Sequence, residues 1–254
     1  MLVSLNLSGL PPVIGILLSV LAGMLAGAVL SGIAGVLKLL FNANELLSTM
    51  MLNYLTSLFI SLLLSGALKD PKSSMEQTAA IAANLRLPII LQGSRLHAGI
   101  FIALAATLLI WFLQQRTVAG FEMRLSGANA KSASYAGVNA RRSLILVIVI
   151  SGALSGLGGA LELLGNQYKL TIGFSNSFGF DAIGIAVMGQ YSPVGIILAS
   201  FLFAALRVGT SSMQRGVGVP LPMLYILQGI IVIAVIVSNY FVKKIMDSMV
   251  EGRA

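Results

Sequence analysis

Long runs without charge constrain this chain more than any other feature. Residues 1–37 contain no Asp, Glu, Lys or Arg, and neither do residues 144–161 and 182–206. About 20 apolar residues in a helix are enough to cross the hydrocarbon core of a bilayer. Charged residues make up only 9% of the chain, whereas a soluble domain carries about 25%. The sequence therefore predicts an all-α, polytopic transmembrane helical bundle.

Other classes of protein fit this composition poorly. The runs lack the short alternation of polar and apolar residues that a transmembrane β-barrel requires. The formal charge of +8 comes from basic residues between the apolar runs, which is typical of a membrane protein and gives no reason to expect a nucleic-acid partner. Cysteine is absent, and His97 is the only histidine. We therefore expect no metal site, cofactor or catalytic residue, and no enzymatic activity.

We predict one transmembrane domain over residues 1–254. Its predicted spans are 11–37, 46–66, 98–113, 144–165 and 222–242. The stretch from 181 to 207 contains Gly189, Pro193 and Gly195, so we expect two legs, 181–189 and 194–207, around a broken or re-entrant segment. A loop is expected over 210–220.

Charge predicts the orientation of the chain in the membrane. The polar stretch 116–143 holds five of the sixteen basic residues against one acid, Glu122, and Lys243 and Lys244 follow the last span. Both regions are expected in the cytoplasm. The legs at 181–207 must then contribute no net crossing, and the polar loop 67–97 lies outside with the N-terminus. An outward N-terminus indicates that preceding spans are missing.

Several polar residues fall within or beside the predicted spans. For Asn53 a hydrogen bond between helices and a place on a substrate path are equally supported. For Glu162 a place on the path and a structural pair are equally supported. The candidate substrate path comprises Asn53, Glu162, Asn166, Gln167, Tyr168, Asp181 and Gln228.

Two segments resemble each other without gaps. VLSGIAGVLKLLFN (29–42) and ALSGLGGALELLGN (153–166) share eight of fourteen residues, and the predicted orientation runs the two helices in opposite directions. Inverted repeats of this kind are common in transporters, although Gly- and Leu-rich helices also resemble each other by chance.

Three sequence blocks also resemble a known family. The blocks are GANAKSASYAGVNARRS with ISGALSGLGGALELLG, then NELLSTMMLNYL, and FGFDAIGIAVMGQYSPVGIILASFLFAAL. They are similar to the permeases of ATP-binding cassette importers for simple sugars and nucleosides. The resemblance implies that 127–138 forms a short coupling helix on the cytoplasmic ATPase. The implied contact residues are Gly127, Asn129, Ala130, Tyr135, Ala136 and Gly137.

The resemblance also implies the partners of the chain. They are cytoplasmic ATPase subunits that bind the ATP, a second permease subunit, which is either a copy or a different chain, and an extracytoplasmic solute-binding protein. The chain would be a multi-pass protein of the cytoplasmic membrane, surrounded by lipid. The alternative is a secondary transporter driven by an ion gradient, for which Glu45, Glu162 and Asp181 would be the ion-linked groups.

Overall fold

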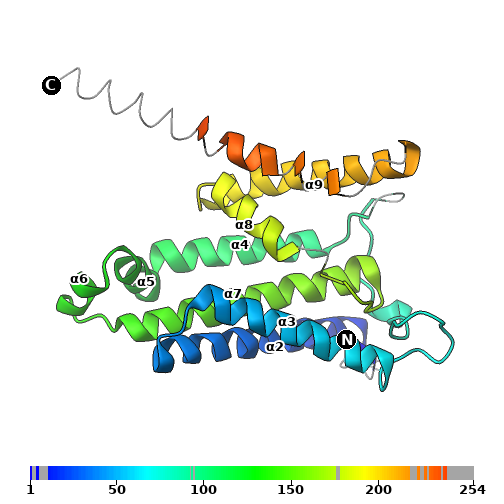
Figure 1. Ribbon diagram of the computed structural model, residues 1–254, viewed down its shortest axis with the longest axis horizontal. Coiled ribbons are helices and arrows are strands. Elements are labelled where there is room, and N and C mark those ends of the chain that lie inside the picture. The colour runs from blue at the N-terminus through cyan, green and yellow to red at the C-terminus, as the bar shows by residue number, and fades with distance from the viewer. Residues whose placement is uncertain are drawn as a thin grey trace. The chain divides into compact units, whose positions relative to one another are not determined.

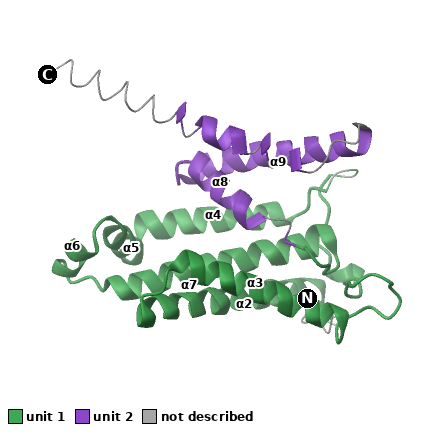
Figure 2. Ribbon diagram, in the orientation of Figure 1, with its two compact units in different colours: residues 1–174 green, residues 175–254 purple. Residues whose placement is uncertain are grey.

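The computed structural model describes residues 1, 4–5, 11–91, 93, 95–175, 178–217, 222–223, 226–227, 229–235 and 237–238. The chain divides into two compact units, Met1–Phe174 and Ser175–Ala254 (Figure 2). The regular secondary structure of the described residues is helical, apart from isolated bridges. Five of these helices are long and apolar enough to cross a membrane. The predicted all-α polytopic class is confirmed.

Four long helices build the first unit (Figure 1). They are α2 (Pro12–Phe41), α3 (Glu45–Ser65), α4 (Gly99–Arg116) and α7 (Ala140–Glu162). Asn42, in the left-handed conformation at φ 49°, ends α2. Two residues later the Asn44 side chain caps α3 by accepting hydrogen bonds from the amides of Leu46 and Leu47. The short turn from Asn42 to Asn44 therefore separates two spans.

Helices α2 and α7 pack closely and antiparallel through small residues. A Cβ added to Gly23 would lie 3.0 Å from the Cβ of Ala160, and one added to Gly27 would overlap the carbonyl oxygen of Gly152. In lipid, helix association depends on such close backbone approach, because apolar side chains gain little by leaving the hydrocarbon. The Gly-rich spacing of α2 is therefore used for a contact within the chain.

The segment predicted as a polar loop, 67–97, is folded against the end of α7. The amides of Thr78, Ile81 and Leu87 donate to the carbonyl oxygens of Leu170, Tyr168 and Leu164, at 3.0, 2.9 and 3.0 Å. Ile81 and Leu85 are buried in the apolar cluster that α7 helps to form. Residues 66–91, 93, 95–98 and 163–174 together make what we call the loop end of the first unit.

The opposite end of the first unit carries two short helices, α5 (Val118–Ala128) and α6 (Ala130–Tyr135) (Figure 1). Thr117 fixes the corner between α4 and α5: its hydroxyl donates to the carbonyl of Leu113 and accepts from the amide of Gly120. Gly120 allows this corner, because an added Cβ would overlap the Leu113 carbonyl oxygen. Most of the polar stretch 116–143 is thus helical.

The second unit contains an antiparallel pair, α8 (Phe178–Met188) and α9 (Pro193–Val217). The chain turns between the two helices just after Met188, and Gly189 allows this tight turn because an added Cβ would lie 2.6 Å from the amide nitrogen of Ile196. The predicted loop over 210–220 is wrong as far as Val217. Thr210 and Ser211 lie within α9, and their hydroxyls donate to the carbonyl oxygens of Leu206 and Arg207 one turn earlier. The predicted span 222–242 falls partly outside the described residues.

Candidate functional site

Three of the predicted path residues meet where α7 runs into the loop end. Asn166 Nδ2 donates to Glu162 Oε1 at 2.7 Å, and Gln167 Nε2 donates to the same oxygen at 3.3 Å. Both amides reach it because residues 163–167 form one π-helical turn at the end of α7. Such wide turns are frequent at functional sites. Among the described residues Glu162 has no ion pair, and its second oxygen, Oε2, has no hydrogen-bond donor.

A cavity of about 290 Å³ opens beside this carboxylate. Its polar lining comes from Arg95, His97 and Glu162, and its apolar lining from the first turns of α4 and the last turns of α7. The sequence gives no reason to expect a site at His97, because the chain has no second histidine and no cysteine. The position of His97 where a loop meets a span was the one available signal, and the long-range contact to α7 was not visible in the sequence.

Two glycines hold the His97 ring. A Cβ on Gly99 would lie 2.6 Å from the ring atom Nδ1, and a Cβ on Gly165 would lie 2.5 Å from it. His97 Nδ1 accepts a hydrogen bond from the Gly99 amide at 3.2 Å. A neutral imidazole that accepts at Nδ1 carries its proton on Nε2. His97 is therefore fixed in place, with Nε2–H as a donor.

Two other predicted path residues have different surroundings. Tyr168 is held within the loop end: its hydroxyl donates to the Gly165 carbonyl at 2.9 Å, and the guanidinium of Arg86 lies 4.6 Å from its ring centroid. Asn53 is exposed on α3 and makes no hydrogen bond to a described residue. Gln228, also predicted for the path, lies outside the described residues.

In the second unit, Asp181 and Arg207 form an ion pair at 3.2 Å between α8 and α9. The Arg207 guanidinium also lies 4.0 Å from the ring centroid of Phe178. Both charged side chains are mostly covered, with 14% and 27% of their surface exposed. Asp181 is thus bonded to a basic side chain, as is Glu45, which pairs with Lys38 at 3.3 Å.

The α5–α6 end presents the predicted ATPase contact residues. Asn129 begins α6 by accepting from the amides of Lys131 and Ser132, and Gly137 ends it with φ at +78°. Ala133 is fully buried and fixes the helix, whereas 92% of Tyr135 is exposed. The six predicted contact residues are all exposed: Gly127, Asn129, Ala130, Tyr135, Ala136 and Gly137.

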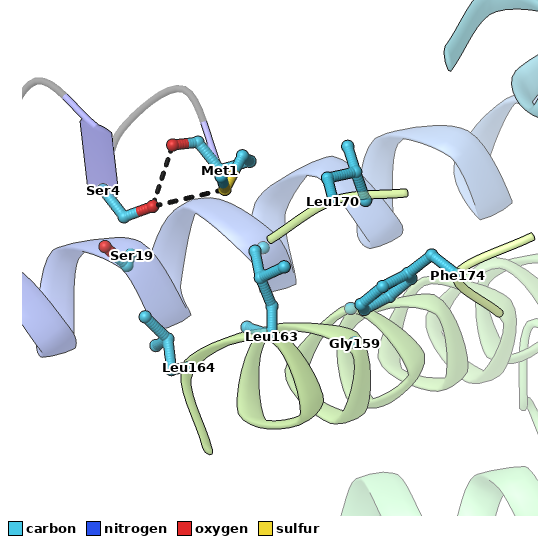
Figure 3. Close-up of a pocket in the computed structure, with 11 residues that line it drawn as sticks. Met1, Ser4, Ser19, Gly159, Leu163, Leu164, Leu170 and Phe174 are labelled. Carbon is cyan, nitrogen blue, oxygen red and sulfur yellow. Dashed lines mark hydrogen bonds between the residues drawn. The ribbon is translucent and has the colours of Figure 1, made fainter. Parts of the chain in front are cut away.

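A second cavity, of about 220 Å³, lies beside the α2–α7 crossing (Figure 3). Leu163, Leu164 and Phe174 line it with little polar surface. The Ser4 hydroxyl donates to the Met1 carbonyl at 2.8 Å, and burial lowers the pKa of the Met1 α-amino group. The buried Ser19 hydroxyl has no partner among the described residues. This lining lacks the converging polar groups that orient a polar solute.

Comparisons with known proteins agree with this architecture. The family model described as "Branched-chain amino acid transport system / permease component" matches residues 1–236. The chain is 34% identical to the guanosine ABC transporter permease protein NupP of Bacillus subtilis, over 94% of this chain and 69% of that one. It is 31% identical to the glucose ABC transporter permease protein TsgB13 of Haloferax volcanii, over 94% and 65%.

A third relative is the nucleoside ABC transporter permease protein NupB of Lactococcus lactis, 32% identical over 85% of this chain and 62% of the relative. The chain thus spans 62% to 69% of the lengths of these relatives. Bacillus subtilis and Lactococcus lactis each have a second similar permease, NupQ and NupC. No solved structure matches the chain. The chain belongs to the family of branched-chain amino acid transport system permease components, and it is a multi-pass membrane transport protein rather than an enzyme.

Proposed function

We propose that this chain is the membrane-spanning permease subunit of an ATP-binding cassette importer that moves a nucleoside or a simple sugar across the cytoplasmic membrane. Its relatives' names support both solutes, and their occurrence in pairs supports a second permease subunit beside it. ATP would be bound by cytoplasmic ATPase subunits, and an extracytoplasmic binding protein would deliver the solute. The observation that carries the proposal is the exposed Tyr135 on α6.

Helix α6 is built as a contact element. It is only six residues long. Asn129 caps its first end, Ala136 caps its last, and Gly137 follows in the left-handed conformation. The buried Ala133 holds its inner face, so a large aromatic side chain at Tyr135 projects without local cover. Exposed aromatic side chains surrounded by small residues are typical anchors of protein interfaces. An ATPase surface with a groove for one aromatic ring fits this shape.

The contact element is linked to the long helices. Helix α6 packs on α5 and α7, and α5 packs on α4 and α7. The Thr117 corner joins α4 to α5 through two side-chain hydrogen bonds. A displacement of α6 by the ATPase would therefore be passed to α4 and α7, which carry the polar cavity at their other ends. This provides two sites and a physical connection, which coupling requires.

Tyr135→Ala is expected to weaken binding of the ATPase by at least about tenfold, because it removes the proposed anchor. The measurement is the amount of ATPase that co-purifies with the tagged permease at equal permease loading. Tyr191→Ala is the matched control, because Tyr191 is 74% exposed in the second unit, outside the proposed contact. Equal recovery of the ATPase with the wild-type and Tyr135→Ala chains would refute the contact.

The choice between an ATP-driven and a gradient-driven transporter has its own test. Two of the three carboxylates that a gradient-driven carrier would use, Glu45 and Asp181, are paired with Lys38 and Arg207. We expect solute uptake to stop when ATP is depleted and to persist when an uncoupler is added while ATP is maintained. Uptake that persists without ATP but collapses with the uncoupler would support the secondary transporter.

A further inference from the structure

We infer that the cavity lined by Arg95, His97 and Glu162 binds the vicinal diol of a neutral solute, such as the ribose of a nucleoside or the ring of a free sugar. This inference rests on the proposed function and adds to it a site and a chemical class of ligand. The three residues come from two segments that meet beside the loop end: Arg95 and His97 lie just before α4, and Glu162 is the last residue of α7. The cavity, of about 290 Å³, is roomy enough for a single sugar ring.

The first fixed group is an acceptor. Asn166 and Gln167 both donate to Oε1 of Glu162, which sets the plane of the carboxylate and leaves Oε2 as the open acceptor. A guanine edge binds a carboxylate through two N–H donors and needs both oxygens free. A hydroxyl group needs only one oxygen. The amide contacts therefore favour a sugar hydroxyl over a base at this position.

The second fixed group is a donor. The Gly99 amide occupies Nδ1 of His97, so Nε2–H remains to donate. Gly99 and Gly165 hold the ring by contact, which lowers the entropy lost when a ligand binds. A hydroxyl both donates and accepts, so two neighbouring hydroxyls satisfy Oε2 and Nε2–H together. Arg95 adds a further donor at the rim.

The experiment measures binding of defined solutes to the full chain in lipid nanodiscs by saturation-transfer difference NMR. The probes are guanosine, 2′,3′-dideoxyguanosine, D-ribose, D-glucose and L-leucine. We expect guanosine or one of the two sugars to bind. If the bound solute is guanosine, removal of its diol is expected to weaken binding by at least about tenfold, because Glu162 Oε2 and His97 Nε2–H would lose their partners. Binding confined to L-leucine would overturn the inference.

Glu162→Gln supplies the second arm. The new amide oxygen keeps the hydrogen bonds from Asn166 and Gln167, so the amide nitrogen replaces Oε2 and the open acceptor becomes a donor. We expect affinity for the bound diol solute to fall at least about tenfold, and His97→Gln to have a similar effect. Glu122→Gln on α5 removes the same charge away from the cavity and is expected to bind as the wild type does.

The outcomes separate the site from the proposed function. Co-purification with the ATPase should be the same for Glu162→Gln as for the wild type, and thermal unfolding checks that the variant is folded. Unchanged solute affinity in Glu162→Gln and His97→Gln would overturn the diol site while leaving the ATPase contact intact. Failure of all three diol probes to bind the wild-type chain would also overturn it.

Discussion

Gly152→Ala is expected to destabilise the chain by about 3 kcal/mol, because the added methyl group has no room at the crossing of α2 and α7. The new Cβ would overlap the Ser31 hydroxyl and the carbonyl oxygen of Gly27, and the second of these belongs to backbone. The helices must therefore separate along the crossing, and their close contact is lost. The free energy of unfolding is measured by titrating the chain in micelles with SDS and following its circular dichroism.

Gly159→Ala is the matched control on the same helix. An added Cβ at Gly159 meets nothing within 4 Å, so the substitution has only its effect on helix propensity, a gain of up to about 1 kcal/mol. The same chemical change seven residues apart should thus have opposite signs. If Gly152→Ala were as stable as Gly159→Ala, the close crossing would not exist in the folded protein.

The crossing also bears on the internal repeat. The matching segments begin at residues 29 and 153, so equivalent residues are 124 apart (153 minus 29) and Ala28 corresponds to Gly152. The helices approach closely where Gly27 meets Gly152, one residue from that equivalent pair, and just as closely where Gly23 meets Gly156. A two-fold axis that exchanged the antiparallel helices would pass through this point. The inverted repeat itself stays a prediction, because any two antiparallel helices in close contact allow such an axis.

The sequence predicted the features that depend on local chemistry. Apolar runs and their polar ends, such as Asn42 and Asn44, marked the change from α2 to α3. The small residues of α2 permit close helix packing, but the sequence alone does not reveal that Gly23 and Gly27 contact α7. The partner of a helix face depends on contacts between residues far apart in the chain, and a spacing pattern carries no such information.

In the candidate site, too, the local features could be predicted from the sequence and the long-range contacts could not. Glu162, Asn166 and Gln167 were predicted separately as polar residues near the end of a span, and the π-helical turn that brings them together was not predicted. His97 joins them through a loop whose backbone pairs with residues after α7. The prediction of a loop over 210–220 is wrong up to Val217 because local preference was overridden by the helix around it. Serine and threonine favour turns in isolation, but in α9 their hydroxyls bond to the preceding helical turn.

Asp181→Asn is the second substitution with a large expected effect, because it removes the carboxylate that faces Arg207 in a mostly covered position. Removing one partner of a mostly covered ion pair is expected to cost about 3 kcal/mol of stability. The effect falls on the α8–α9 pair. Since the chain has no cysteine, Ala199→Cys provides a single reporter thiol at a residue that is 4% exposed on α9.

We expect the reporter thiol to react with a maleimide about a hundredfold faster in Asp181→Asn than in the otherwise unchanged chain, because local opening of the pair becomes easier by that energy. The double variant Asp181→Asn with Arg207→Gln removes both charges and should recover most of the protection. Arg215→Gln removes an exposed charge from the same helix and should leave the rate unchanged. If the reporter thiol reacted as fast in the double variant as in Asp181→Asn alone, the loss of protection would come from the altered Asp181 side chain itself. The ion pair would then not be what holds α8 against α9.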